Sequence, residues 1–215
     1  MSLFLGIDFG TTGVRSSIID KNKKELINFS VSIDSPISKG SLVYQNPSLW
    51  WSALIKNLTF LKTKIELNKI ERLSIDGTSG TVLITDHLGN PLDDALMYND
   101  ASAVKESKLV ESISDNHPIV STSTNALVRA LSLINKLKKE KYRILHQADW
   151  IACKLINDYT YSDENNALKL GYDCVERSWP KWFDRLPIEM NSLPNIKIPG
   201  QSLSLIHISE PTRLR

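Results

Sequence analysis

The fold of this chain is decided close to its start, by the stretch LFLGIDFGTTGVR at residues 3–15. A short apolar run ends at a single carboxylate, Asp8, and the turn GTTG at residues 10–13 follows almost at once. A second apolar run then leads away from Arg15. Two strand-like runs around a turn that contains glycine are typical of a β-hairpin.

This turn carries groups that can bind a metal-bound phosphate. Glycine allows backbone N–H groups to curl around an anion without interference from a Cβ atom. Threonine hydroxyls add donors, arginine adds a fixed positive charge, and a carboxylate such as Asp8 can hold a hydrated Mg²⁺. A buried strand with an ordinary turn is the competing interpretation, but neither needs an aspartate at this position. The residues expected to contact phosphate are Gly10, Thr11, Thr12, Gly13 and, unless it only faces solvent, Arg15.

Two better-known phosphate motifs are excluded. The chain contains no G-x-x-x-x-G-K-[ST] sequence, so it is not a P-loop protein. The string Asp8-Phe9-Gly10 matches the DFG of protein kinases, but no glycine-rich loop, V-A-I-K or H-R-D sequence precedes it. The match is therefore accidental.

The composition predicts a globular cytoplasmic protein. The 215 residues suit one large domain, and a hydrophobic content of 41% can bury a core. The formal net charge is only +2 and the basic residues are scattered, so we expect no nucleic-acid partner. The two cysteines lack metal-ligand spacing, and no apolar run is long enough to span a membrane. A first strand at Leu3 leaves no room for a signal peptide.

The next part of the chain alternates between strand and helix patterns. Residues 25–33 predict a third antiparallel strand, residues 34–40 a loop, and residues 70–76 a further strand. Asn46-Pro47 is typical of a helix start, with Asn as the cap and Pro at the first helical position. The apolar stripe of that helix is Trp50, Leu54, Leu58, Leu61 and Ile65.

A second polar turn, GTSG at residues 77–80, follows the strand that ends at Asp76. Residues 81–98 then predict a hairpin-like unit that ends in Tyr98-Asn99-Asp100. Small polar residues at strand ends are where α/β proteins bind ligands. Thr78 and Ser79 also suit a plain turn, and Asn99 and Asp100 also suit the cap of a helix after residue 100.

Beyond residue 100 the pattern is mainly helical. Asn125 predicts the cap of a helix over residues 125–137, and residues 147–157 predict another. Residues 163–166 predict the cap of one more helix, which stops at Gly171. The stretch LSLIHISEPTR at residues 203–213 resembles a translated sequencing-library adapter, with a natural strand and turn as the alternative. We therefore expect a domain over residues 1–201, incomplete at its C-terminal end, and an artefact over residues 202–215.

The sequence DFGTTG at residues 8–13 resembles the first phosphate motif of the actin, hexokinase and heat-shock-chaperone ATPases. Later segments are similar to FGGY carbohydrate kinases, over Leu3 to about Gly200. The resemblance identifies the chain as the N-terminal part of such a kinase, with an actin-like, ribonuclease H-like α/β fold built on a mixed five-stranded sheet flanked by helices. The segments that carry it are QNP and WW within residues 45–51, IDGTSG at residues 75–80, YND at residues 98–100, ADW at residues 148–150, and Asp163, Asn166 and Gly171.

The resemblance implies ATP and Mg²⁺ as cofactors and a small sugar as substrate. Asp8 would hold Mg²⁺ through water beside the attacking hydroxyl, and the turn at residues 10–13 would cradle the phosphates. The residues that would bind the sugar are Thr78, Ser79, Asn99 and Asp100.

The same resemblance bears on which sugar is bound. Xylulose kinases of this family usually carry Gln-Met-His-Gly and Trp-Asn-Asp-x-Arg where this chain has GTSG at residues 77–80 and YNDAS at residues 98–102. The forms found here look most like those of cyanobacterial and plant D-ribulose kinases. D-ribulose is therefore the expected substrate. Xylulose or another polyol or ketose is the alternative, and a non-catalytic actin-like ATP-binding scaffold is an alternative of another class.

The catalytic base of the family is an aspartate in a glycine-rich loop, which would lie beyond Gly200. No G-x-x-D sequence follows Gly200 here. The family's adenine pocket lies in a second domain, and catalysis requires the two domains to close. We therefore expect the 215-residue chain, without that second domain, to be inactive.

Overall fold

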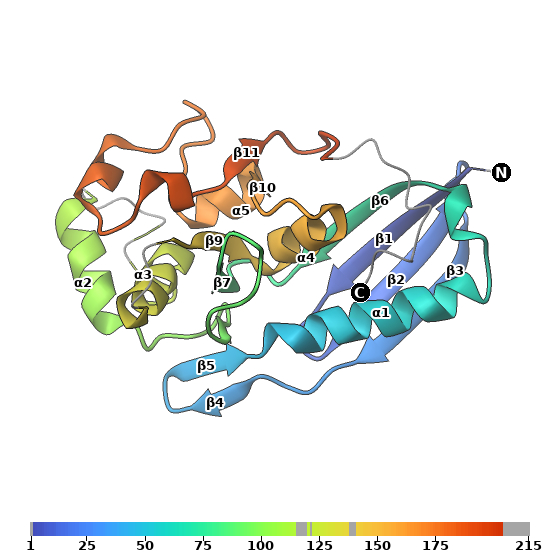
Figure 1. Cartoon of the computed structure of the whole chain (residues 1–215), viewed down its shortest axis with the longest axis horizontal. Coiled ribbons are helices and arrows are strands. Elements are labelled where there is room, and N and C mark those ends of the chain that lie inside the picture. Colours follow the sequence, from blue (N-terminus) through green and yellow to red (C-terminus); the bar gives the residue numbers. More distant parts are fainter. Residues whose placement is uncertain (1, 115–119, 121, 138–140, 204–215) are drawn as a thin grey trace. The chain divides into compact units, whose positions relative to one another are not determined.

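The computed structural model describes residues 2–114, 120, 122–137 and 141–203 (Figure 1). The described residues form two compact units. The first contains the residues up to Ser35 and Ser48–Gly77, and the second contains Pro36–Pro47 and Thr78–Gln201.

The first unit is built on a mixed sheet of four strands, in the order β3-β2-β1-β6. Its β1 strand pairs antiparallel with β2 and parallel with β6, and β2 pairs antiparallel with β3. The predicted hairpin and the predicted third and fourth strands are confirmed. The bounds are β1 (Leu3–Phe9), β2 (Gly13–Asp20), β3 (Glu25–Ser32) and β6 (Ile70–Gly77).

One face of this sheet is apolar and packs against helix α1 (Pro47–Lys62). Along β1, Ile7 and Phe9 are buried while Asp8 between them is partly exposed, because successive side chains of a strand point to opposite faces. Phe29 of β3 stacks on Phe60 of α1 with ring centroids 3.7 Å apart. The helix starts at Pro47 as predicted and ends at Lys62, before Ile65, and a short 3₁₀ helix (Leu67–Lys69) leads into β6.

The second unit contains an antiparallel sheet of five strands, in the order β4-β5-β8-β7-β9. Helix α3 (Ala126–Lys136) packs on this sheet and buries Leu127 and Leu131 against Val82 and Ile84. The expected loop at residues 34–40 is wrong in part, because residues 37–39 pair with β5. The bounds are β4 (Ile37–Lys39), β5 (Leu42–Gln45), β7 (Val82–Thr85), β8 (Ala95–Leu96) and β9 (Arg143–His146).

The other elements of the second unit are short. Asn125 caps α3 by accepting from Leu127 N, and Asp163 caps α5 by accepting from Asn166 N, so both predicted caps are confirmed. Asn99 and Asp100 do not cap the helix after residue 100, because α2 begins at Val104 with Ala103 as its N-cap. The bounds are α2 (Val104–Ile113), α4 (Gln147–Ile156), β10 (Tyr161–Asp163), α5 (Glu164–Lys169), η2 (Lys181–Arg185), η3 (Met190–Ser192) and β11 (Asn195–Lys197), with β10 and β11 paired in parallel.

The expected α/β class is confirmed, with one difference in the sheet. In the described part of the chain the mixed sheet has four strands rather than five. The reason is that strands after Gly77 pair with one another in the second unit and add no strand to β6. The expected adapter-derived segment lies, from residue 204 onward, outside the described residues. Within the residues that are described, no helix has both the length and the apolar character needed to cross a bilayer.

The stacked pair Phe29–Phe60 is expected to couple α1 to the sheet. Aromatic pairs contribute about 0.5–1.5 kcal/mol beyond the area that they bury. In a double-mutant cycle of Phe29→Leu and Phe60→Leu, urea denaturation should give a coupling free energy of that size. Additive effects of the two substitutions would contradict the direct contact.

Candidate functional site

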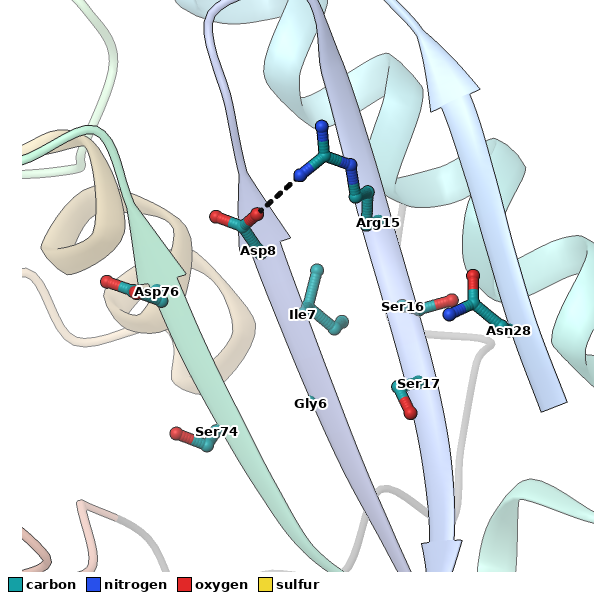
Figure 2. Close-up of a pocket in the computed structure, with 9 residues that line it drawn as sticks. All are labelled: Gly6, Ile7, Asp8, Arg15, Ser16, Ser17, Asn28, Ser74 and Asp76. Atoms are coloured by element: carbon teal, nitrogen blue, oxygen red, sulfur yellow. Dashed lines mark ion pairs between the residues drawn. The ribbon is translucent and has the colours of Figure 1, made fainter. Parts of the chain in front are cut away.

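The β1–β2 hairpin places Asp8 and Arg15 opposite each other. They are direct partners in the antiparallel register, so their side chains lie on the same face of the sheet. Arg15 Nη1 lies 3.5 Å from Asp8 Oδ2, and the two side chains remain 76% and 50% exposed (Figure 2). An ion pair this exposed adds little stability. Both charges are thus available to a ligand, and Arg15 has a defined partner rather than only facing solvent.

A second carboxylate, that of Asp76, lies beside Asp8. The two residues are partners in the parallel pairing of β1 and β6, and Asp76 is exposed. Its Oδ1 accepts a hydrogen bond from Gly77 N at 2.8 Å. The sequence interpretation did not assign Asp76 a role. The available signal was that Ile75-Asp76-Gly77, like residues 7–10, sets a carboxylate at the end of a strand, shortly before a glycine.

These side chains line an open pocket of about 310 Å³ on the sheet face opposite α1. Mg²⁺ takes oxygen ligands, retains several waters and is commonly held by one or two carboxylates. Asp8 and Asp76 fit that requirement. Among the described residues no cluster of three or more His, Cys, Asp or Glu side chains could hold a metal. The lining residues are Gly6, Ile7, Asp8, Arg15, Ser16, Ser17, Asn28, Ser74 and Asp76.

The turn after β1 is tightly closed. Gly10 N donates to Gly13 O at 2.9 Å, and Ile33 N donates to Thr12 O at 3.0 Å. A Cβ atom at Gly13 would lie 3.1 Å from Val31 O, so glycine there permits the close approach of β3. The N–H of Gly10 is therefore used inside the turn. The Thr12 side chain, in contrast, is exposed.

The four residues expected to bind sugar all belong to the second unit, whereas the hairpin residues belong to the first. Ser79 and Asn99 are exposed and Thr78 is half-buried. Asp100 is fully buried, and its carboxylate accepts from Val43 N at 2.7 Å and from Ser102 Oγ at 2.9 Å. Protein donors therefore already engage the Asp100 carboxylate, which leaves the exposed Ser79 and Asn99 as the more accessible pair.

Two buried side chains that the sequence interpretation did not single out hold these segments. Gln147 Oε1 accepts from Thr78 N at 2.8 Å. Arg129, which is 1% exposed, donates from Nη2 to Gly80 O at 2.6 Å and from Nη1 to Tyr98 O at 2.9 Å. Burial lowers the pKa of Arg129 to about 10, although the nearby Asp100 charge opposes that shift. An arginine inside the apolar run LVRALSL was a signal for such a role, whereas Gln147 had none.

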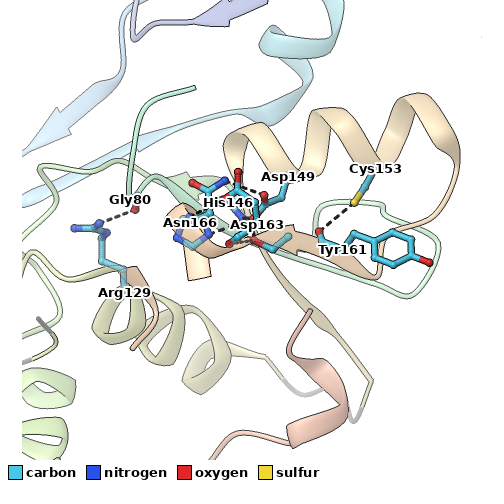
Figure 3. Close-up of polar contacts among 9 residues, drawn as sticks. Gly80, Arg129, His146, Asp149, Cys153, Tyr161, Asp163 and Asn166 are labelled. Atoms are coloured by element: carbon cyan, nitrogen blue, oxygen red, sulfur yellow. Dashed lines mark hydrogen bonds and ion pairs between the residues drawn. The ribbon is translucent and has the colours of Figure 1, made fainter. Parts of the chain in front are cut away.

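A polar network joins α4 to β10 and α5 (Figure 3). The buried carboxylate of Asp149 accepts from Ser162 Oγ at 2.7 Å and from Asn166 Nδ2 at 2.8 Å. His146 Nδ1 lies 3.4 Å from the same carboxylate. Trp150 Nε1 donates to Gly89 O at 2.9 Å. The ADW segment and Asn166 thus hold the unit together.

The fold and the site define a class of protein: an actin-like α/β domain with a carboxylate at the end of its first strand. The family model of the FGGY family of carbohydrate kinases, N-terminal domain, matches residues 3–210. The chain therefore belongs to the FGGY family of carbohydrate kinases, within the N-terminal domain of that family.

Individual relatives are distant in sequence. The chain is 22% identical over 209 residues to the xylulose kinase of Staphylococcus xylosus. This alignment covers 91% of the chain and 43% of the relative. It is 23% identical over 212 residues to the glycerol kinase of Mycoplasma genitalium, covering 89% of this chain and 42% of the relative. The chain thus spans less than half the length of these relatives.

Solved structures share the fold. The ligand-bound xylulose kinase from Lactobacillus acidophilus superposes with a TM-score of 0.79 at 18% identity, over 92% of this chain and 42% of that one. The gluconate kinase from the same organism gives a TM-score of 0.79 at 19% identity, over 91% of this chain and 42% of that one. At these identities the likeness establishes the fold.

Cys153 is expected to be unreactive in the folded chain. It is buried, and burial raises the pKa of its thiol to about 12. Only about one molecule in 10⁴ would then carry the thiolate at pH 8, and the thiolate is the nucleophile. In a Cys174→Ser background, iodoacetamide should leave the native protein unmodified at pH 8 and alkylate it after unfolding in urea. Native labelling that reaches a plateau between pH 8 and 9 would contradict the raised pKa.

Proposed function

We propose that the complete protein containing this domain is a cytoplasmic kinase that transfers the γ-phosphoryl group of ATP to the 5-hydroxyl of D-ribulose. Phosphoryl transfer requires little covalent chemistry from the protein, because alignment and neutralisation of charge supply most of the catalysis. Membership of a carbohydrate kinase family supports the reaction class. The two cysteines are free thiols, which suits a reducing compartment.

The observation that carries the proposal is the exposed carboxylate of Asp8 at the end of a buried strand, with Asp76 in register beside it. Asp8 would hold Mg²⁺ through water, and Asp76 would help to hold the same hydrated ion. Mg²⁺ would supply neutralisation of phosphate charge. The turn at residues 10–13 and Arg15 would contact phosphate. Arg15 could exchange its exposed contact with Asp8 for one with phosphate at low cost.

The proposed sugar contacts come from the turn at residues 77–80 and from the segment after β8. Ser79 and Asn99 are exposed and would donate to and accept from sugar hydroxyls. Thr78 would contribute its side chain, and Asp100 would support the segment through its buried carboxylate. The preference for D-ribulose rests on the forms GTSG and YND in these segments, which lack the His and Arg usual in xylulose kinases.

Two other functions compete with this one. Relatives described as xylulose and glycerol kinases favour another polyol or ketose as the substrate. A non-catalytic actin-like scaffold would bind ATP without dependence on sugar. A coupled assay of ADP release, run on the protein from its complete reading frame with D-ribulose, D-xylulose, glycerol and gluconate, separates these functions. The highest kcat/KM for D-ribulose is expected, and sugar-independent nucleotide binding without turnover would overturn the proposal.

Asp8→Asn is expected to lower kcat by at least about 10²-fold while the unfolding midpoint stays unchanged. The reason is that the amide keeps the size of the side chain but removes the charge that holds the metal. Glu71→Gln, which removes an exposed carboxylate from β6 of the same unit, is the matched control and should keep wild-type kcat. Equal activity of the two variants would contradict a role for Asp8 in metal binding.

The 215-residue chain alone is expected to show no sugar-dependent ADP release. It spans about 43% of its xylulose kinase relative. The resemblance to the family implies that the catalytic base and the adenine pocket would lie in the remainder. The measurement is the same coupled assay, with the complete protein as the positive control. Turnover of D-ribulose by the 215-residue chain would show that this chain supplies its own base.

A further inference from the structure

Arg129 is a buried cation whose hydrogen bonds converge on backbone carbonyls from separate segments. Nη2 donates to Gly80 O at 2.6 Å, and Nη1 donates to Tyr98 O at 2.9 Å, to Asp100 O at 3.3 Å and to Thr124 O. These carbonyls belong to the turn after β6, the segment after β8 and the turn before α3. One guanidinium group therefore ties three parts of the second unit together, and Figure 3 shows its bond to Gly80.

Burying this cation raises the free energy of the folded state, so a functional reason for its presence is expected. Burial of a charged group is unfavourable, and a well-packed apolar side chain would often be neutral or stabilising in its place. The neighbours of Arg129 along α3 are fully buried apolar residues, Val128 and Ala130. The planar guanidinium, in contrast, offers five donors in a fixed geometry. An arginine at this position can therefore hold several carbonyl acceptors at once, which an apolar side chain cannot do.

The acceptors flank the exposed residues of the proposed sugar site. Gly80 directly follows Ser79, while Tyr98 and Asp100 lie on either side of Asn99. The strands themselves link these segments weakly, because β7 and β8 share a single residue pair, Val82–Leu96. Gln147 holds the first segment at Thr78, and the Asp100 carboxylate holds the second at Val43. The bonds made by Arg129 differ in that one side chain joins the two segments to each other.

We infer that Arg129 is a positioning residue that fixes the turn at residues 77–80 relative to the segment at residues 98–100. This inference rests on the proposed function in so far as those segments bind sugar. Arg129 itself is buried, so it would act through these two segments and not by contact with the sugar. Preorganisation of binding side chains lowers the cost of ordering them when the ligand arrives. Loss of the guanidinium should thus weaken sugar binding and leave ATP binding unaffected.

The first test compares steady-state kinetics of Arg129→Met and Arg129→Lys in the protein from its complete reading frame. We expect Arg129→Met to raise the KM for the sugar by at least about 10-fold while the KM for ATP stays within about twofold. Arg129→Lys keeps the charge but lacks the planar set of guanidinium donors, so it should give an intermediate rise in the KM for the sugar. Arg143 is the matched control, because its guanidinium also donates to a carbonyl of the same unit, that of Asn191. Arg143→Met should leave both KM values near wild type.

A second substitution perturbs the same contact from the other side. A Cβ atom at Gly80 would lie 3.2 Å from Arg129 Nη2, and the positive φ of +84° at Gly80 disfavours any other residue. Gly80→Ala should therefore reproduce the selective rise in the KM for the sugar. It provides the test if Arg129→Met does not fold. An unchanged KM for the sugar in Arg129→Lys and Gly80→Ala, or an equal rise in both KM values, would overturn the inference.

Amide hydrogen exchange tests the positioning role without any substrate. In Arg129→Lys, peptides covering residues 77–85 and 95–103 should both exchange about 10-fold faster than in wild type, while Arg143→Lys leaves them unchanged. Faster exchange spread evenly over the second unit, or unchanged exchange in either segment, would overturn the inference. If the wild-type protein phosphorylates no sugar, the proposed function fails, and the exchange result alone still decides whether Arg129 fixes the two segments.

Discussion

Asp8 reaches the open face of the sheet because its neighbours Ile7 and Phe9 are buried on the other. The alternation of a β-strand sends successive side chains to opposite faces, and burial of the apolar pair holds the register. The two neighbouring strands carry the same alternation, so Arg15 and Asp76 are brought to the face of Asp8. A slip of one residue would exchange the charged set for the apolar set. The pocket therefore depends on the packing beneath it.

In the second unit, buried polar side chains rather than strand alternation fix the exposed segments, because they form hydrogen bonds with the backbone of turns. Gln147 and Arg129 bind the turn at residues 77–80 from opposite ends, at Thr78 and Gly80. Asp149 holds β10 and α5 through Ser162 and Asn166. A loop has few backbone partners of its own, and buried donors or acceptors supply them. Such turns can then present Ser79 and Asn99 to solvent in a defined geometry.

Motifs that mark the family thus divide into two physical roles. DFGTTG at residues 8–13 and GTSG at residues 77–80 each present side chains to solvent, namely those of Asp8, Thr12 and Ser79. The ADW segment, with Asp163 and Asn166, instead forms the buried and half-buried network around Asp149. Asp100 belongs with this second group by its burial and its bonds to Val43 and Ser102. A family motif by itself therefore does not say whether its residues touch a ligand or hold the fold.

The sequence by itself determined the local elements: the hairpin around Asp8, the helix that starts at Pro47, and the caps Asn125 and Asp163. These depend on alternation, turn chemistry and capping within a few residues. Only the tertiary structure decided the partners that lie far apart in the chain. It placed Asp76 beside Asp8, paired residues 37–39 with β5 and buried Asp100. It also brought the backbone carbonyls of three separate segments within hydrogen-bond distance of Arg129. Such contacts depend on which segments pack together, and no local pattern of residues encodes that choice.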